Sequence, residues 1–166
     1  MHRLLLMGVS GSGKSTLGPL LGAALGVPFA DADAFHPPAN IEKMSRGEPL
    51  TDADRAPWLA ALGAWLAGQA GGGIIGCSAL KRAYRDALRA AAPGLRLLFL
   101  AGPPALIAAR QAARPGHFMP ASLMDSQFAT LEHPAPEEDA IILDIAQPPV
   151  ALLRAALAAL PPAQPR

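Results

Sequence analysis

A glycine-rich stretch near the start of the chain constrains the fold more than any other feature of the sequence. It reads Gly-Val-Ser-Gly-Ser-Gly-Lys-Ser over residues 8–15 and matches the pattern G-x-x-x-x-G-K-[ST] in full. An apolar run, residues 3–7, precedes it and a helical segment follows it. In such a strand, loop and helix, the loop N–H groups and the helix N-terminus form a site for phosphate. This context predicts a P-loop rather than a glycine turn beside a solvated lysine.

Short apolar segments that alternate with helical ones indicate how the rest of the chain folds. Besides residues 3–7, strand-like runs occupy residues 29–33, 73–77, 95–100 and 140–145. Helical periodicity predicts a helix capped by Thr51 and further helices at 14–25, 79–91, 104–113, 120–131 and 149–160. Strands alternating with helices form βαβ units. We therefore expect a three-layer α/β P-loop NTPase, in which a five-stranded parallel sheet has helices on both faces.

The first of these helices contains a local conflict. Gly18 and Pro19 lie inside its apolar stripe. A proline there removes a backbone hydrogen bond and can cost about 3 kcal/mol. We expect the tertiary fold to override this local preference.

Composition limits the size of the protein and the kinds of partner it has. The 166 residues include 14 basic and 13 acidic side chains, and this net charge of +1 favours neither nucleic acid nor a membrane surface as partner. The longest uncharged run, residues 56–80, is interrupted by Pro57 and three consecutive glycines, so we expect no membrane span. Residues 4–7 end at Gly8 and indicate a buried strand rather than a signal peptide. The length predicts one domain over residues 1–160 with a disordered tail at 161–166.

The single cysteine bears on the compartment and on metal binding. Cys77 cannot form an internal disulfide, and no Cys/His cluster is present to hold a structural zinc ion. We therefore expect a cytoplasmic protein, in which Cys77 belongs to the core and Ser78 caps the next helix. Trp58 and Trp65 lie on an apolar helical stripe, so we interpret them as packing residues.

The P-loop predicts a nucleotide site but does not by itself choose the class of protein. Lys14 is expected to bridge the β- and γ-phosphates of ATP, and the Ser15 hydroxyl to ligate Mg²⁺. The chain lacks an N-K-x-D sequence for reading guanine and is too short for a transporter ATPase, which leaves a small-molecule kinase. The predicted ATP-binding residues of the loop and first helical turn are Gly8, Val9, Ser10, Gly11, Ser12, Gly13, Lys14, Ser15 and Thr16.

Two aspartates at the end of the second strand-like run are candidates for the chemistry. Residues two apart in a strand face the same way, so Asp31 and Asp33 would both lie beside the P-loop at the carboxyl edge of the sheet. We predict that Asp31 holds Mg²⁺ through water and that Asp33 accepts the proton of the acceptor hydroxyl. The alternative is that one of them only caps the following turn.

A closing lid is predicted over residues 112–122. Arg110 and Arg114 are four residues apart and precede a Pro/Gly-bounded loop that contains His117. Arginines aimed at the transferring phosphate and hinges on both sides are what a kinase lid needs. Exposed arginines on a solvated helix face are the alternative reading.

Several separated blocks of sequence resemble the small bacterial-type gluconokinases, also called thermoresistant gluconokinases. The P-loop is generic, but Asn-Ile-Glu-Lys-Met at residues 40–44 and Cys-Ser-Ala-Leu-Lys at residues 77–81 are far more particular to that family. Further matching blocks are His36-Pro37, Gly47-Glu48-Pro49-Leu50, Pro57-Trp58-Leu59, Tyr84-Arg85-Asp86, Gly116-His117-Phe118, Gln127-Phe128 and Gln147-Pro148. The resemblance extends over nearly the whole chain.

This resemblance implies a nucleoside-monophosphate-kinase-like fold with a mobile lid, Mg²⁺ dependence and commonly a homodimer. The implied activity is ATP-dependent phosphorylation of D-gluconate on its 6-hydroxyl. Catalysis would fall to Lys14, Asp33, Arg110 and Arg114, with Arg110 and Gln147 also on the nucleotide. The alternatives are a kinase for another small sugar acid or polyol, and a regulator that binds nucleotide without catalysis.

The same resemblance implies which residues meet the acceptor. A carboxylate substrate needs a cation, and arginine offers two parallel donors to it. Arg46 is the first candidate for this contact and Lys81 the second. The full predicted substrate-binding set is Asp33, His36, Lys43, Arg46, Arg55, Lys81, Arg85 and His117.

Overall fold

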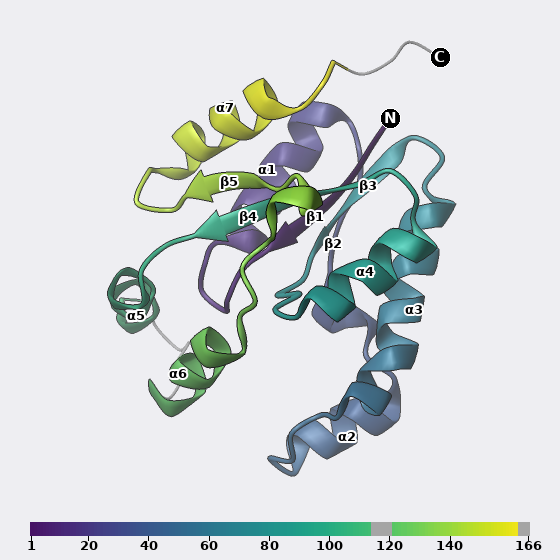
Figure 1. Cartoon of the computed structure of the whole chain (residues 1–166), viewed down its shortest axis with the longest axis vertical. Coiled ribbons are helices and arrows are strands. Elements are labelled where there is room, and N and C mark those ends of the chain that lie inside the picture. Colours follow the sequence, from purple (N-terminus) through teal and green to yellow (C-terminus); the bar gives the residue numbers. More distant parts are fainter. Residues whose placement is uncertain (114–120, 163–166) are drawn as a thin grey trace.

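Five parallel strands form the sheet on which the molecule is built (Figure 1). The computed structural model describes residues 1–113 and 121–162. The strands are β1 (His2–Met7), β2 (Phe29–Asp31), β3 (Gly72–Gly76), β4 (Leu95–Ala101) and β5 (Ile141–Asp144), in the order β2-β3-β1-β4-β5. All neighbouring pairs are parallel, which confirms the predicted sheet. β2 is shorter than expected, because it ends at Asp31 and not at residue 33.

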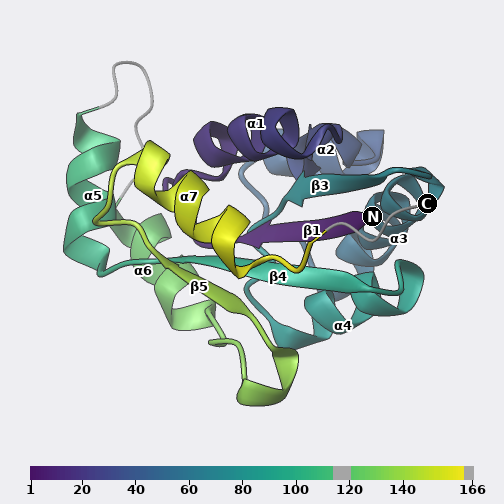
Figure 2. The same cartoon turned by 90° about the horizontal axis from the view of Figure 1, so that it is seen from above.

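Helices cover both faces of this sheet (Figure 2). α1 (Lys14–Leu25) and α7 (Pro149–Ala159) lie on one face, and α3 (Asp52–Gly68) and α4 (Arg82–Ala91) lie on the other. The alternation of side chains along β1 accounts for the two cores, since Leu4 and Leu6 pack with α1 and α7 whereas Leu5 and Met7 pack with α3 and α4. All four are at most 1% exposed. The predicted three-layer arrangement is confirmed.

Shorter helices complete the described part of the chain. They are α2 (Pro38–Ser45), α5 (Pro104–Ala112), α6 (Ala121–Thr130) and two 3-10 helices, η1 (Ala32–Phe35) and η2 (Pro136–Glu138). α2 was not predicted, and its apolar residues Ile41 and Met44 are 55% and 41% exposed, so the sequence has no buried stripe there. In this part of the chain, none of the helices combines the length and apolar character needed to cross a bilayer.

The packing of α1 explains the Gly18-Pro19 pair. A Cβ atom on Gly18 would lie 2.1 Å from the Cε2 atom of the Phe29 ring, so glycine allows α1 to lie against β2. Pro19 is on the exposed side of the helix, which continues through it to Leu25. The α1 helix begins after Gly13, whose φ of 105° is a left-handed conformation that favours glycine.

The starts of α3 and α4 differ in how well the sequence predicts them. α3 begins with a capping box in which the Thr51 hydroxyl accepts from the Asp54 N–H at 3.1 Å and Asp54 Oδ2 accepts from the Thr51 N–H at 2.8 Å. This confirms the predicted cap. α4, however, begins at Arg82 rather than at residue 79, and Ser78 does not cap it. Residues 77–81 instead form a loop in which Ala79 has a φ of 46°.

Candidate active site

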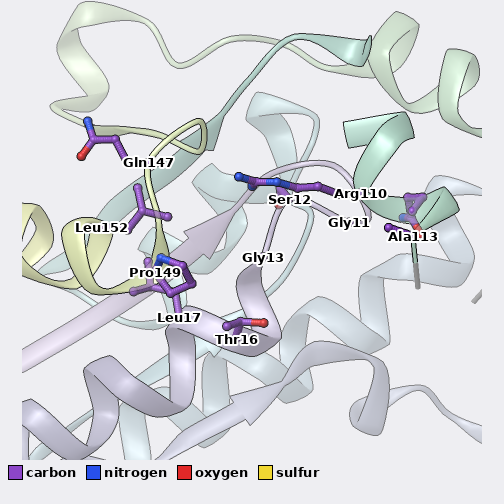
Figure 3. A pocket seen from close by; sticks show the side chains of 11 residues that line it. Gly11, Ser12, Gly13, Thr16, Leu17, Arg110, Ala113, Gln147, Pro149 and Leu152 are labelled. Atoms are coloured by element: carbon purple, nitrogen blue, oxygen red, sulfur yellow. The ribbon is translucent and has the colours of Figure 1, made fainter. Parts of the chain in front are cut away.

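A pocket of about 340 Å³ opens beside the P-loop at the carboxyl end of β1 (Figure 3). The P-loop, α5 and the turn after β5 surround it, and Arg110 and Gln147 reach it from opposite sides. The structure thus brings both predicted nucleotide contacts from outside the loop to the P-loop itself. The lining residues are Gly11, Ser12, Gly13, Thr16, Leu17, Arg110, Gln111, Ala113, Gln147, Pro149 and Leu152.

Lys14, the first residue of α1, is folded against the P-loop. Its Nζ donates to the carbonyl oxygens of Gly8 at 2.8 Å and Val9 at 3.0 Å. Burial lowers the pKa of Lys14 to about 8, although negative charge at Asp33 and Asp31 opposes this shift. Both aspartates therefore lie within electrostatic reach of the lysine, as predicted for residues flanking one phosphate site.

The two aspartates do not share a strand face, so that part of the prediction is wrong. Asp31 ends β2, and its Oδ1 accepts from the backbone N–H of Asp33 at 2.9 Å, which caps η1. The alternative reading of a capping aspartate thus applies to Asp31. Asp33 lies in η1, where the chain turns, and both side chains are exposed. Within the described residues, no three His, Cys, Asp or Glu side chains come together to hold a metal ion by themselves.

His36 and Trp58 form a stacked pair next to Asp33. Their ring centroids are 4.5 Å apart with planes 10° from parallel, and the Trp58 Nε1 donates to the Ala32 carbonyl at 2.7 Å. The packing role predicted for Trp58 is confirmed, and the ring additionally supports His36. Burial lowers the pKa of His36, with the negative charge of Asp33 opposing and the positive charge of Arg55 assisting.

Four of the cations predicted to meet the acceptor divide into two sets. Lys43 is bound to Asp54 at 2.6 Å, and Arg46 lies between Glu42 and Glu48 at 3.0 Å from each. Arg55 and Lys81, in contrast, converge on Tyr84 and Asp52. These two cations come from different elements, α3 and the loop before α4, and the structure brings them together.

Arg85 contradicts its predicted role as a substrate contact. The side chain is fully buried, and its Nε and Nη2 donate to the two carboxylate oxygens of Glu138 at 2.8 and 2.9 Å. Its Nη1 donates to the carbonyl oxygens of Ala79 at 2.9 Å and Leu80 at 3.3 Å. With its donors satisfied inside the protein, Arg85 holds the 77–81 loop rather than a ligand.

Several residues of the site were not predicted as functional. Gln127 on α6 accepts from the Ser10 N–H of the P-loop at 2.7 Å, and the side chain of Gln111 lies against Gly11. Tyr84 donates to Asp52 at 2.7 Å. Gln127 and Tyr84 belong to the sequence blocks that resemble the gluconokinases. However, no sequence pattern of glutamine or tyrosine predicts a contact with a P-loop or with a carboxylate.

The remaining predicted residues are either buried or outside the described part. Cys77 is 2% exposed, and burial raises the pKa of its thiol to about 12, which confirms its predicted place in the core. Arg114 and His117 lie outside the described residues, as do positions 114–120 of the predicted lid and 163–166 of the predicted tail.

The fold and site define a class of protein. A P-loop after the central strand of a parallel sheet, with carboxylates beside it and cations further out, is the arrangement of a small P-loop kinase. Residues 10–147 match the family model described as shikimate kinase. A crystal structure of shikimate kinase from Bacteroides thetaiotaomicron, 19% identical, superposes with a TM-score of 0.68 over 95% of this chain and 97% of that one, a likeness of fold.

Relatives of higher identity narrow this class to one family. A gluconokinase from Gluconobacter oxydans is 52% identical over 83% of this chain and 79% of its own length. The thermoresistant gluconokinase of Escherichia coli is 47% identical over 89% and 86%. A crystal structure of a gluconokinase from Sinorhizobium meliloti 1021 is 51% identical with a TM-score of 0.87, over 95% of this chain and 90% of that one. The chain belongs to the gluconokinase family.

Proposed function

We propose that the protein transfers the γ-phosphoryl group of ATP to the 6-hydroxyl of D-gluconate, giving 6-phospho-D-gluconate and ADP. The observation that carries this proposal is the identity of 52% and 47% to two proteins named gluconokinase over most of their length. The pocket supports the nucleotide half of the proposal, because the P-loop and Arg110 line it. The negative charges of Asp31 and Asp33, which act on the pKa of Lys14, support the phosphoryl-transfer half.

On the nucleotide side, residues 8–16 bind the triphosphate. The loop N–H groups and the N-terminus of α1 bind phosphate oxygens, and Gln147 and Leu152 lie where the base enters the pocket. Lys14 exchanges its two carbonyl partners for β- and γ-phosphate oxygens. Arg110 donates to the Ile145 carbonyl and lines the same pocket, so it is placed to turn toward the phosphates.

On the acceptor side, Asp33 takes the proton of the 6-hydroxyl as the hydroxyl oxygen attacks the γ-phosphorus. Its exposed carboxylate lies within electrostatic reach of Lys14, which binds the phosphate under attack. His36, Lys43, Arg46, Arg55, Lys81 and His117 form the set from which the polyhydroxy acid takes its contacts. Arg110 and Arg114 neutralise charge on the transferring group, with residues 112–122 closing over it.

Mg²⁺ is the cofactor that this reaction implies, and the residues present fit it. The exposed Ser15 hydroxyl is the P-loop ligand, and Asp31 keeps its second carboxylate oxygen for a water-mediated contact while Oδ1 caps η1. Such a donor set, with few protein ligands and the rest from phosphate and water, is what Mg²⁺ prefers. The bound cation would offset the charge of the β- and γ-phosphates.

The test is gluconate-dependent ADP release by the purified protein, together with an equal-concentration panel of sugar acids and polyols. We expect gluconate to be the best acceptor. Asp33→Asn should lower kcat about a hundredfold or more with the affinity for ATP retained, because general base catalysis contributes on that order. Near-full turnover in Asp33→Asn would overturn the role of Asp33, and a better acceptor in the panel would overturn the substrate.

We also propose that the protein is a cytoplasmic homodimer. The buried free thiol of Cys77 supports a reducing compartment. The dimer rests on the family resemblance alone. Light scattering after size-exclusion chromatography tests it, since a dimer has twice the 17.1 kDa mass of the chain.

A further inference from the structure

One peptide group of the P-loop, the unit between Val9 and Ser10, is hydrogen-bonded through both its oxygen and its hydrogen. Its oxygen, the Val9 carbonyl, accepts from the Lys14 Nζ at 3.0 Å and from the Ser12 N–H at 3.1 Å. Its N–H, that of Ser10, donates to the Gln127 Oε1 on α6 at 2.7 Å. Oxygen and hydrogen lie on opposite sides of a trans peptide, so Gln127 holds this unit from the side opposite to Lys14.

The N–H groups that remain for a phosphate are others of the same loop. Within the described residues, four N–H groups of the P-loop and the start of α1 have no acceptor in the protein, and they belong to Gly11, Gly13, Lys14 and Ser15. The Ser10 N–H, in contrast, is taken by Gln127. Gln127 therefore holds the loop without occupying the N–H groups that a phosphate would use.

The helix that carries Gln127 is itself fixed against the P-loop. Met124 on α6 is 6% exposed and packs in the same core cluster as Val9. Just after the end of α6, the Glu132 N–H donates to the Leu80 carbonyl at 2.8 Å. Gln127 thus approaches the loop from an element whose position is defined by packing and by a backbone hydrogen bond.

The packing beneath the peptide leaves room for the peptide to turn. A cavity of about 40 Å³ lies between the end of β4 and α6, and Val9, Phe99, Phe128 and Leu131 are among the residues that line it. Side chains that border a void lose contacts on that side. The orientation of the peptide therefore depends on its hydrogen bonds more than on apolar contact.

Nucleotide binding removes one of these hydrogen bonds. Lys14 leaves the Gly8 and Val9 carbonyls when it takes up β- and γ-phosphate oxygens. The peptide then loses its ammonium donor while strong acceptors arrive nearby. If the Ser10 N–H had no acceptor of its own, it would turn toward a phosphate oxygen, because an unpaired donor is costly. Such a turn would displace the phosphate from its position for transfer.

We propose that Gln127 is a positioning residue for phosphoryl transfer, whose side-chain oxygen holds the Ser10 N–H so that the Val9–Ser10 peptide keeps its orientation after Lys14 has turned to ATP. The proposal rests on the proposed function and extends it to a residue of α6. Gln127 contacts no reacting atom in this role. Its effect is therefore on kcat more than on the affinity for ATP.

Two substitutions separate these effects. Gln127→Met removes the acceptor and keeps the length of the side chain, and we expect kcat to fall about ten- to a hundredfold, with KM for ATP and for gluconate within about twofold, because small displacements cost that much. Gln127→Glu keeps an acceptor oxygen and adds negative charge near the phosphates. It should keep kcat within about threefold and raise KM for ATP about tenfold. A glutamine that only stabilises the fold would not separate kcat from KM in this way.

Amide hydrogen exchange of Ser10, followed by NMR, measures the hydrogen bond directly and without substrates. Ser10 should exchange at least about tenfold faster in Gln127→Met than in the unmodified protein or in Gln127→Glu. The matched control is Gln69→Met, because Gln69 is also half-buried and bonds the backbone, donating to the Trp65 carbonyl at 3.2 Å. It follows α3 at the opposite edge of the sheet from the P-loop, so we expect kcat, KM and Ser10 exchange to be unchanged. Thermal unfolding compares the stability of all variants.

Three results would overturn the positioning role: unchanged kcat in Gln127→Met, unchanged Ser10 exchange in that variant, or an equal fall of kcat in Gln127→Met and Gln127→Glu. The last would show that the amide NH₂ group acts and not the oxygen. Absence of gluconate turnover by the unmodified protein would instead refute the proposed function. Ser10 exchange needs no substrate, so it still decides in that case whether Gln127 holds the loop.

Discussion

Lys14 combines a positive charge with a buried position, and this combination makes nucleotide binding depend on pH. Burial lowers its pKa to about 8, whereas negative charge nearby acts in the opposite direction. The phosphates of ATP would add more negative charge beside the ammonium group and raise the pKa again. The free protein therefore loses the Lys14 proton at a lower pH than the complex does.

We predict that ATP binding weakens as pH rises through about 8. Below that pH Lys14 is already protonated and the Kd is constant, whereas above it each pH unit raises the Kd up to about tenfold and binding takes up a proton. Calorimetry between pH 7 and 9.5 in two buffers of different ionisation enthalpy measures both. Lys14→Arg, which stays charged, should bind with a Kd independent of pH, and a flat profile for the unmodified protein would contradict the prediction.

The sequence predicted the residues of this site correctly only where their role depends on residues nearby in the sequence. The spacing in residues 8–15 defines the P-loop, and Cys77 at the end of an apolar strand is in the core as expected. Arg85 and Asp31 show the limit. Arg85 is buried because Glu138, 53 residues later, is buried with it, and Asp31 is turned into a cap by the chain direction after β2. The partner of Arg85 is too distant in the sequence for a local pattern to show it, whereas capping by one of the two aspartates was the alternative that the sequence left open.

Among the elements, α1 depends on two glycines that face Phe29. The Phe29 ring lies against Gly18 on α1 and Gly76 on β3, and a Cβ on Gly76 would be 3.1 Å from the ring, so the ring has little room to retreat. We predict that Gly18→Ala destabilises the protein by about 1–3 kcal/mol, the usual cost of overpacking. Urea unfolding measures this change.

Gly68→Ala at the end of α3 is the control for that substitution. Nothing lies within 4 Å of a Cβ placed there, so alanine should be neutral or stabilise by about 0.4–1 kcal/mol through the unfolded chain. Equal effects of the two substitutions would show that helix propensity, and not contact with Phe29, decides the cost at Gly18.

The loop between β3 and α4 depends on a buried ion pair. Arg85 holds the Ala79 and Leu80 carbonyls, Glu138 holds Arg85, and the Glu132 N–H donates to Leu80 at 2.8 Å. Arg85→Met should cost about 3 kcal/mol or more because Glu138 stays buried with fewer donors. Arg85→Met with Glu138→Leu should cost clearly less than the sum of the two single changes.

Measurements of activity separate the role of the Arg85–Glu138 pair in positioning the loop from its effect on stability. In the double variant we expect stability to recover while KM for gluconate stays raised several-fold, because the loop that carries Lys81 has lost its donor. Unfolding free energies and KM for both substrates measure the two effects. Recovery of KM together with stability would show that the pair serves stability alone.

Elements were predictable where a periodic apolar face meets the sheet. α1, α3, α5 and α7 have such faces or clear start signals, and their predicted positions agree with the structure. α2 has exposed apolar residues and so no such face. The start of α4 is displaced by three residues because Arg85 holds the preceding carbonyls in a loop, a contact that local propensity does not encode.

The molecule as a whole is nearly neutral, yet its charges are unevenly distributed. The net charge is +1, yet Arg110 lines the pocket at the P-loop that carries Lys14, and Arg55 and Lys81 both approach Asp52. Elsewhere ion pairs join separate elements: Lys43–Asp54 connects α2 to α3, and Arg85–Glu138 connects α4 to η2. These pairs make the stability of the whole molecule sensitive to acid.

We predict that the protein loses stability as pH falls from about 4.5 to about 2. The Arg85 guanidinium, followed by Arg89, lowers the pKa of Glu138 to about 2, and Lys43 does the same for Asp54. Because these pKa values are lower in the folded state, the unfolded state binds more protons in this range. The stabilisation is therefore complete above about pH 4.5 and lost as pH approaches 2.

The difference in Tm between the unmodified protein and Glu138→Gln, measured by calorimetry, should be constant above pH 5 and shrink toward zero at pH 2. Asp139→Asn, which affects an exposed pair with Arg96, should change Tm little at any pH. A difference for Glu138→Gln that persists undiminished at pH 2 would contradict the prediction.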